Sequence, residues 1–297
     1  MAKSWLIGGR YTSTIPSAAT RYVQLGTGAE HRPQSTEAGV RRRHQYAGDL
    51  TNLYFRCSAN TFTTGNTTVT LRKNGAAGNN TVSITAGSTA YFEDITHTDS
   101  VTTEDETCVE IACQTEASKT LTLDQVSCNF TATTNTVSHL VCYVDMTAAG
   151  GSTYYAPIAG GTYTATTGET YLNRARQAGT LKGLNIYVVT YGAGASSTAT
   201  SRKNSAAGNM TISFNATGYF EDTTNSDTIA LDDLMDVKVV FGAGGTSSNV
   251  AAYGADFETT DGTFLITTTA VEQFMSATKY FQIAGDELDR TVGLIIS

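Results

Sequence analysis

An internal duplication constrains the fold of this chain more than any other feature of its sequence. Short motifs from the first half return in the second half in the same order. The matching stretches are residues 47–53 and 178–184 (Ala-Gly-x-Leu-x-x-Leu, 131 residues apart), 72–79 and 202–209 (Arg-Lys-Asn, 130 apart), and 91–94 and 219–222 (Tyr-Phe-Glu-Asp, 128 apart). Preserved order and a nearly constant spacing are expected of a duplicated domain whose loops have diverged.

The repeat also sets the expected domain organisation. Leu6-Ile7, Leu140-Val141 and Leu265-Ile266 occupy equivalent places. We therefore expect one repeat in residues 1–135, a second in 136–262, and the opening strands of a third in 263–297. Strands without a body of their own must join an existing sheet, so this last stretch either completes the second repeat or pairs with a neighbouring subunit.

Each repeat reads as a series of short strands. Apolar and polar residues alternate at period two in the segments 53–57, 67–72, 80–84, 108–113, 126–130, 184–189, 210–214, 237–241 and 253–257,. Asn74-Gly75 is a strong hairpin turn, whereas the second repeat has Ser205 in place of the glycine,. Helical periodicity is confined to one turn at 286–290. About eight strands per ~130 residues predict an all-β chain of two tandem β-sandwiches of the jelly-roll kind.

Composition excludes several classes of protein. A 40% hydrophobic share is enough for a packed core, and the net charge of −8 argues against a nucleic-acid binder,. Nothing approaches the ~18 consecutive apolar residues of a membrane span. The first residues lack the apolar run of a signal peptide, so we expect synthesis in the cytoplasm.

Five cysteines, all in the first half, leave two interpretations open. They are Cys57, Cys108, Cys113, Cys128 and Cys142, and no two have the CxxC spacing of a zinc site,. They are either buried free thiols or partners in disulfides that form after exposure to an oxidant.

The acidic residues of the repeat are the best ligand candidates. Both repeats keep them: Glu93, Asp94 and Asp99 in the first, Glu221, Asp222 and Asp227 in the second. Clustered carboxylates in a loop suit Ca²⁺, which takes 6–8 oxygen ligands. The alternative is a solvated loop at one end of the sandwich whose turn geometry needs these residues.

Basic residues recur just before the Ala-Gly-x-Leu motif. They are Arg41, Arg42 and Arg43 in the first repeat and Arg174 and Arg176 in the second. We expect them at a subunit interface, paired with a neighbour's acidic residues 104–106, unless they lie in a solvated loop. Tyr280, Phe281 and Ile283 of the third repeat are interface candidates as well.

Catalysis is not expected. The sequence has no HExxH, G-x-S-x-G, P-loop or glycine fingerprint, and its four histidines lie far apart,. Several tyrosines could stack on sugars, which keeps a carbohydrate-binding adhesin as an alternative. They are Tyr54, Tyr91, Tyr154, Tyr155, Tyr187, Tyr191 and Tyr219.

The ordered motifs resemble β-sandwich repeats of tailed-phage virion proteins. The resemblance covers residues 48–99 and 179–227, about a third of the chain. It implies a non-enzymatic component of the virion surface, such as a capsid decoration, neck, collar or tail-associated protein. Its expected partners are other copies of itself, in a trimer, and other virion proteins. A bacterial extracellular filament joined by donated strands from 263–297 is the runner-up.

Overall fold

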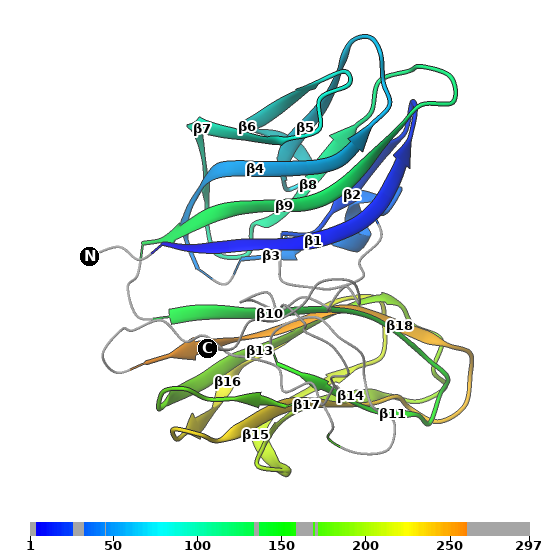
Figure 1. The fold of residues 1–297 in the computed structure, drawn as a ribbon. Coiled ribbons are helices and arrows are strands. Elements are labelled where there is room, and N and C mark those ends of the chain that lie inside the picture. Colours follow the sequence, from blue (N-terminus) through cyan, green and yellow to red (C-terminus); the bar gives the residue numbers. More distant parts are fainter. Residues whose placement is uncertain are drawn as a thin grey trace, which may run out of the picture. The chain divides into compact units, whose positions relative to one another are not determined.

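The structure is a computed structural model, and it describes residues 4–25, 33–44, 46–133, 137–158, 169 and 172–259. It divides into two compact units between residues 135 and 136. The described residues form antiparallel strands with one short 3₁₀ helix (Figure 1). Among them, no helix is long and apolar enough to cross a membrane.

Unit 1 is a jelly roll of two sheets. Its elements are β1 (Ser4–Pro16), β2 (Thr20–Val23), η1 (Glu37–Val40), β3 (Arg42–Arg43), β4 (Gly48–Asn60), β5 (Asn66–Lys73), β6 (Ala76–Thr85), β7 (Tyr91–Val101), β8 (Glu106–Ala112) and β9 (Thr120–Ala132). One sheet has the order β1-β9-β4-β7 and the other β2-β8-β5-β6, with β3 also paired to β8. The chain crosses between the two sheets except at the β5–β6 hairpin and between β2 and β3, which lie in one sheet,.

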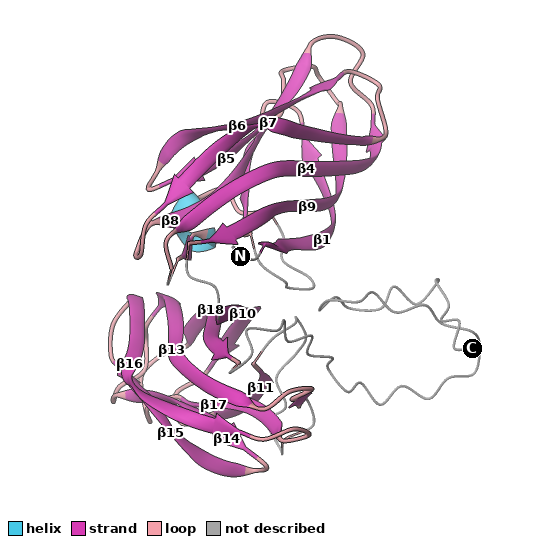
Figure 2. Cartoon of the chain, turned by 90° about the vertical axis from the view of Figure 1, so that its left-hand side faces the viewer, coloured by secondary structure: helices cyan, strands magenta, loops and turns pink. Residues whose placement is uncertain are grey.

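Unit 2 repeats this topology strand for strand (Figure 2). Its elements are β10 (Val137–Ala148), β11 (Thr153–Pro157), β12 (Asn173–Arg174), β13 (Gly179–Thr190), β14 (Ser197–Lys203), β15 (Ala206–Phe214), β16 (Gly218–Ile229), β17 (Leu234–Val240) and β18 (Ser248–Glu258). The sheets have the orders β10-β18-β13-β16 and β11-β17-β14-β15. The predicted all-β, jelly-roll architecture is confirmed.

The places of the repeat's two opening strands are filled in both units. In unit 1, β1 and β2 pair with β9 and β8; in unit 2, β10 and β11 pair with β18 and β17. The predicted third-repeat start at 263–297 and the helical turn at 286–290 lie outside the described residues.

Alternating side chains build a separate apolar core in each unit. Along β5, Val69 and Leu71 are fully buried while Thr70 between them is not, and Phe55 of β4, in the facing sheet, belongs to the same core. Ile186 and Val188 of β13 pack in the same way in unit 2. Burial of such side chains contributes about 1.5–3 kcal/mol each and holds the two sheets face to face.

Strand β7 contains a bulge that β16 repeats. Thr51 of β4 pairs with Thr98, but Leu53 pairs with Asp94. Between these two pairs β7 therefore contains two more residues than β4 does. Asn52, opposite the bulge, has a φ of 54°. The matching residue of β13 is Gly183, with a φ of 63°. Asparagine and glycine tolerate this left-handed conformation better than other residues.

The hairpin turns after β5 and β14 are alike, despite the difference in sequence. Asn74 and Gly75 have φ values of 51° and 82°, and Asn204 and Ser205 have 49° and 66°. Two successive positive φ values are the mark of a type I′ turn. The serine therefore adopts the backbone conformation that the glycine adopts in unit 1.

Candidate functional site

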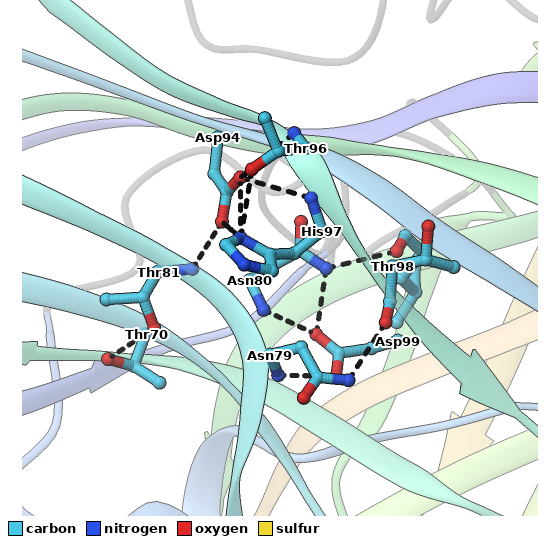
Figure 3. Close-up of polar contacts among 10 residues, drawn as sticks. Thr70, Asn79, Asn80, Thr81, Asp94, Thr96, His97, Thr98 and Asp99 are labelled. Carbon is cyan, nitrogen blue, oxygen red and sulfur yellow. Dashed lines mark hydrogen bonds and ion pairs between the residues drawn. The ribbon is translucent and has the colours of Figure 1, made fainter.

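The acidic motif of unit 1 lies in strand β7, which corrects the expectation of a loop. The side chain of Asp94 is buried, and it points toward the neighbouring edge strand β6 (Figure 3). Its Oδ2 accepts a hydrogen bond from the backbone N–H of Thr81 in β6, at 2.9 Å. Its Oδ1 accepts from the backbone N–H groups of Thr96 and His97 in the bulge, at 3.1 and 3.2 Å. One carboxylate thus joins two edge strands and closes a bulge.

Asp99, five residues further along β7, bonds to β6 as well (Figure 3). It accepts hydrogen bonds from the backbone N–H groups of Asn79 and Asn80, at 2.6 and 2.9 Å, and from the side-chain amide of Asn80, at 2.8 Å. The same amide also donates to the carbonyl of Leu50 in β4, at 3.1 Å. β6 has its own bulge at this point, because Arg72 pairs with Ala77 whereas Thr70 pairs with Thr81.

Unit 2 repeats the Asp94 network almost bond for bond and the Asp99 network in part, because Met210 stands in place of Asn80 and the hydroxyl of Ser201 donates to Asp227 instead, at 2.5 Å. Asp222 accepts from the backbone N–H of Thr211 at 2.9 Å, and from those of Thr224 and Asn225 at 3.1 and 3.0 Å. Asp227 accepts from the backbone N–H of Asn209 at 2.7 Å. The side-chain amide of Asn225 takes the place of the His97 ring beside the carboxylate. The aspartates that both units retain are therefore buried hydrogen-bond acceptors at the edge of the sandwich.

The hydrogen bonds favour the ionised form of these carboxyl groups. Burial alone would raise the pKa of Asp222, but hydrogen bonds from Asn225, Thr211 and Thr224 outweigh it and lower the pKa to about 2,. Burial likewise opposes the shift at Asp94, where bonds from Thr81, His97 and Thr96 hold the pKa well below its usual range.

Small residues let the carboxylates approach the backbone of β6 and β15. A Cβ atom added to Gly78 would lie 2.7 Å from Oδ1 of Asp99, and one added to Gly208 would lie within 2.8 Å of Cγ of Asp227. Both distances are too short for a real contact. The glycine of the Ala-Ala-Gly-Asn sequence that follows each hairpin turn is thus explained by the carboxylate beside it.

This arrangement uses the oxygen atoms that a calcium ion would need. Asp94, Asp99, Asp222 and Asp227 each accept hydrogen bonds from N–H groups of the protein. Glu93 and Glu221 are exposed, because they point away from the buried aspartates that follow them. Among the described residues, no three His, Cys, Asp or Glu side chains lie together so as to hold a metal ion.

The arginines before the Ala-Gly-x-Leu motif find their acidic partners within their own unit. Arg41 pairs with Glu106 at 3.2 Å and Arg43 with Glu104 at 2.8 Å. The expected pairing with residues 104–106 therefore occurs inside one chain, and the place of these arginines at a subunit interface stays a prediction. Arg42 is buried, and it donates to the carbonyl of Leu25 at 3.2 Å.

The matching arginines of unit 2 have an equally local partner. Arg174 and Arg176 each lie 3.6 Å from the carboxylate of Asp232. All three side chains are more than half exposed, so this contact contributes at most about 1 kcal/mol,. Tyr280, Phe281 and Ile283, the other interface candidates, lie outside the described residues.

Of the two interpretations of the cysteines, the structure agrees with buried thiols for four of them. Cys57, Cys108, Cys113 and Cys128 are buried free thiols. Three of them belong to the apolar core, whereas Cys108 is absent from it and faces the other side of β8. Burial raises the pKa of Cys113 to about 11 and that of Cys128 to about 12, so both thiols are unreactive at neutral pH,. The side chain of Cys142 lies outside the described part of the structure.

A second repeated polar group was not foreseen from the sequence. Arg72 of β5 pairs with Glu37 of η1 at 3.2 Å, and Arg202 of β14 pairs in the same way with Glu169. Glu37 and Glu169 are 132 residues apart, so the repeat spacing alone could have aligned them. Asp236 of β17, fully buried, was missed because it adjoins an apolar run.

Neither protein-family models nor curated protein sequences yield a match to this chain.

Proposed function

We propose that this chain is a non-enzymatic structural protein of a tailed-phage particle, a capsid decoration, neck, collar or tail-associated component that oligomerises on the virion surface. One observation carries the proposal: both units retain the same buried carboxylate network, from Asp94 and Asp99 in unit 1 and from Asp222 and Asp227 in unit 2. These four aspartates are the same in both units although the surrounding sequence differs, and each of them joins neighbouring strands.

The chemistry of this network suits a rigid building block. β6 and β15 are edge strands, whose outward N–H groups would otherwise be open to pairing with another chain,. Asp94 and Asp99 occupy such groups on β6, and Asp222 and Asp227 do so on β15. A protein displayed in many copies on one particle needs contacts of a single kind, and protected edges limit uncontrolled association.

Mass spectrometry of purified intact particles tests the proposal directly. The protein should be present in a fixed copy number per particle, and its absence from the particles would overturn the assignment. Light scattering and negative-stain microscopy of the purified full chain give an independent measurement. Discrete oligomers support a virion component, whereas long fibres would favour the bacterial filament.

Carbohydrate binding is the second candidate, and a pair of tyrosines in unit 1 favours it. The rings of Tyr54 and Tyr91 are stacked, with centroids 6.1 Å apart and an interplanar angle of 12°. Tyr91 and the nearby Ile95 are 66% and 71% exposed. A glycan array tests this function with Tyr91→Ala as the variant and Leu231→Ala, an exposed apolar residue of unit 2, as the control. Binding lost only in the first variant would support it, and no binding by the wild-type chain would exclude it.

A further inference from the structure

Asp236 is a buried carboxyl group that the repeat network does not include. Met235, Val237 and Val239 of β17 belong to the core of unit 2, so the alternation of the strand puts Asp236 on the opposite face of the sheet,. The residue is nevertheless 0% exposed. Within the described part of the chain, neither of its carboxylate oxygens has a hydrogen-bond partner.

The charged groups around Asp236 do not balance it. In the strand register, Asp236 lies opposite Arg202 of β14 and Pro157 of β11. The guanidinium of Arg202 is already paired with Glu169, and it also donates to the carbonyl of Ser205. Two carboxyl groups therefore lie near one guanidinium, which is paired with Glu169 and acts on Asp236 only through its charge.

The remaining groups near this site are a lysine and a tyrosine. Lys238 lies two residues along β17, on the same face as Asp236,. Its Nζ is 5.9 Å from the centre of the Tyr155 ring of β11, and the guanidinium of Arg202 is 5.5 Å from the same ring. No described hydrogen bond or ion pair links Lys238 to Asp236, so the lysine does not neutralise the carboxylate directly.

Unit 1 has the same site with different charges. Arg72 of β5 lies opposite Cys108 of β8, so Cys108 occupies the position of Asp236. Like Asp236, it is fully buried, but a thiol is neutral. Glu37 is held there by two arginines, Arg41 at 3.4 Å and Arg72 at 3.2 Å. Unit 1 thus places a neutral thiol beside a glutamate that two arginines hold, whereas unit 2 places a second carboxyl group beside Glu169.

A buried carboxylate without hydrogen-bond donors is costly, and a neighbouring carboxylate adds to the cost. Burial, followed by the charge of Glu169, raises the pKa of Asp236 to about 7, against the opposing charge of Arg202. The protonated form is accordingly the stable one in the folded unit at mildly acidic pH.

We propose that unit 2 binds a proton at Asp236 when it folds, so that its stability depends on pH, whereas unit 1, with Cys108 at the equivalent position, lacks this dependence. An unfolded aspartate ionises near pH 4. Between about pH 4 and 7 the folded unit holds a proton that the unfolded chain has released, so the stability of unit 2 falls as the pH rises. Above about pH 7 the group is ionised in both states, and the dependence ends. The two units therefore share one fold, but their stabilities depend on pH in different ways.

Hydrogen exchange of the full chain tests this proposal and uses unit 1 as an internal control. Protection of amides in β14 and β17 is compared with protection in β5 and β8 from pH 5 to 8, after correction for the intrinsic exchange rate. For unit 2 we expect the opening constant to rise by up to tenfold per pH unit below about pH 6.5 and to level off above pH 7. Unit 1 should show no such rise. Equal pH dependence in the two units, or none in unit 2, would overturn the proposal.

Two variants and one further measurement identify the group. Asp236→Asn and Asp236→Cys, the second of which places the unit 1 residue in unit 2, should both abolish the pH-dependent rise of the opening constant in unit 2. A rise that persists in either folded variant contradicts the assignment to Asp236. Carboxyl ¹³C NMR of the wild-type chain needs no variant. It should show one aspartate that titrates above pH 6, and the absence of any such signal would overturn the proposal.

Discussion

Gly78 lies so close to Asp99 that a Cβ atom on the glycine would be 2.7 Å from the carboxylate oxygen. Gly78→Ala should therefore push the carboxylate away from the N–H groups of Asn79 and Asn80, with a loss of about 1–3 kcal/mol in the free energy of unfolding. Gly39→Ala is the matched control, because its added Cβ would lie 3.9 Å from Oγ1 of Thr36, an ordinary contact. Chemical denaturation of the three proteins provides the comparison, and equal midpoints would contradict the tight approach.

The hairpin turn of unit 2 offers a stabilising substitution. Ser205 has a φ of 66°, in the left-handed region where a side chain costs about 1–2 kcal/mol per residue,. Ser205→Gly should therefore stabilise unit 2 by about 1 kcal/mol, and the reverse change Gly75→Ser should destabilise unit 1 by a similar amount. Thermal unfolding of both variants tests whether the two stability changes have opposite signs, a gain for Ser205→Gly and a loss for Gly75→Ser. A destabilised Ser205→Gly would mean that the serine side chain contributes more than its strained backbone costs.

Acid should weaken the carboxylate network. The folded pKa of Asp222 is about 2, below the ordinary value of 3.8, so its contribution is complete above about pH 5 and is lost as the pH falls through 4 toward 2,. Asp222→Asn should flatten this part of the stability curve of unit 2. Asp124→Asn serves as the control, since Asp124 makes a contact of 3.5 Å with the largely exposed Arg56. Denaturation at pH 2.5, 4 and 5.5 measures the slopes, and parallel curves for wild type and Asp222→Asn would refute the prediction.

Calcium should leave the chain unchanged. The oxygens of Asp94 and Asp99 accept hydrogen bonds from backbone N–H groups, and a cation would have to displace those donors. We expect the same unfolding temperature in millimolar CaCl₂ and in EDTA, and no heat of binding in calorimetry. A calcium-dependent rise that disappears in Asp94→Asn would restore the metal site that the sequence suggested.

The sequence predicts the strands that alternate regularly and misses those that do not. The pattern at 67–72 places β5 (Asn66–Lys73) to within one residue at each end. The acidic cluster of Glu93, Asp94 and Asp99 was expected in a loop, because the bulge between Asp94 and Thr98 interrupts the two-residue period and leaves a run of polar residues. The same bulge brings Asp94 to the backbone of Thr81. Local periodicity contains no information about such a contact between edge strands.

The sequence predicts which residues form the candidate site but not what their carboxylates bind. The duplication alone identifies Asp94, Asp99, Asp222 and Asp227 as the acidic residues to examine. Their hydrogen-bond donors come from another strand, so only the fold shows that the carboxylates are occupied. Asp236 was missed for a different reason: a single charged residue beside an apolar run reads as a strand end, and its burial depends on neighbours distant in sequence.

Removing one buried carboxylate from each unit tests most directly whether the carboxylate network holds the sandwiches together. Asp99→Ala leaves the N–H groups of Asn79 and Asn80 without their acceptor, and Asp227→Ala does the same for Asn209. Hydrogen exchange of the full chain should show that Asp99→Ala destabilises unit 1 and Asp227→Ala unit 2, each by about 2–4 kcal/mol. Asp124→Ala, the surface control, should change stability by less than about 1 kcal/mol. Losses no larger than that of the control would contradict the claim that these carboxylates hold the two sandwiches together.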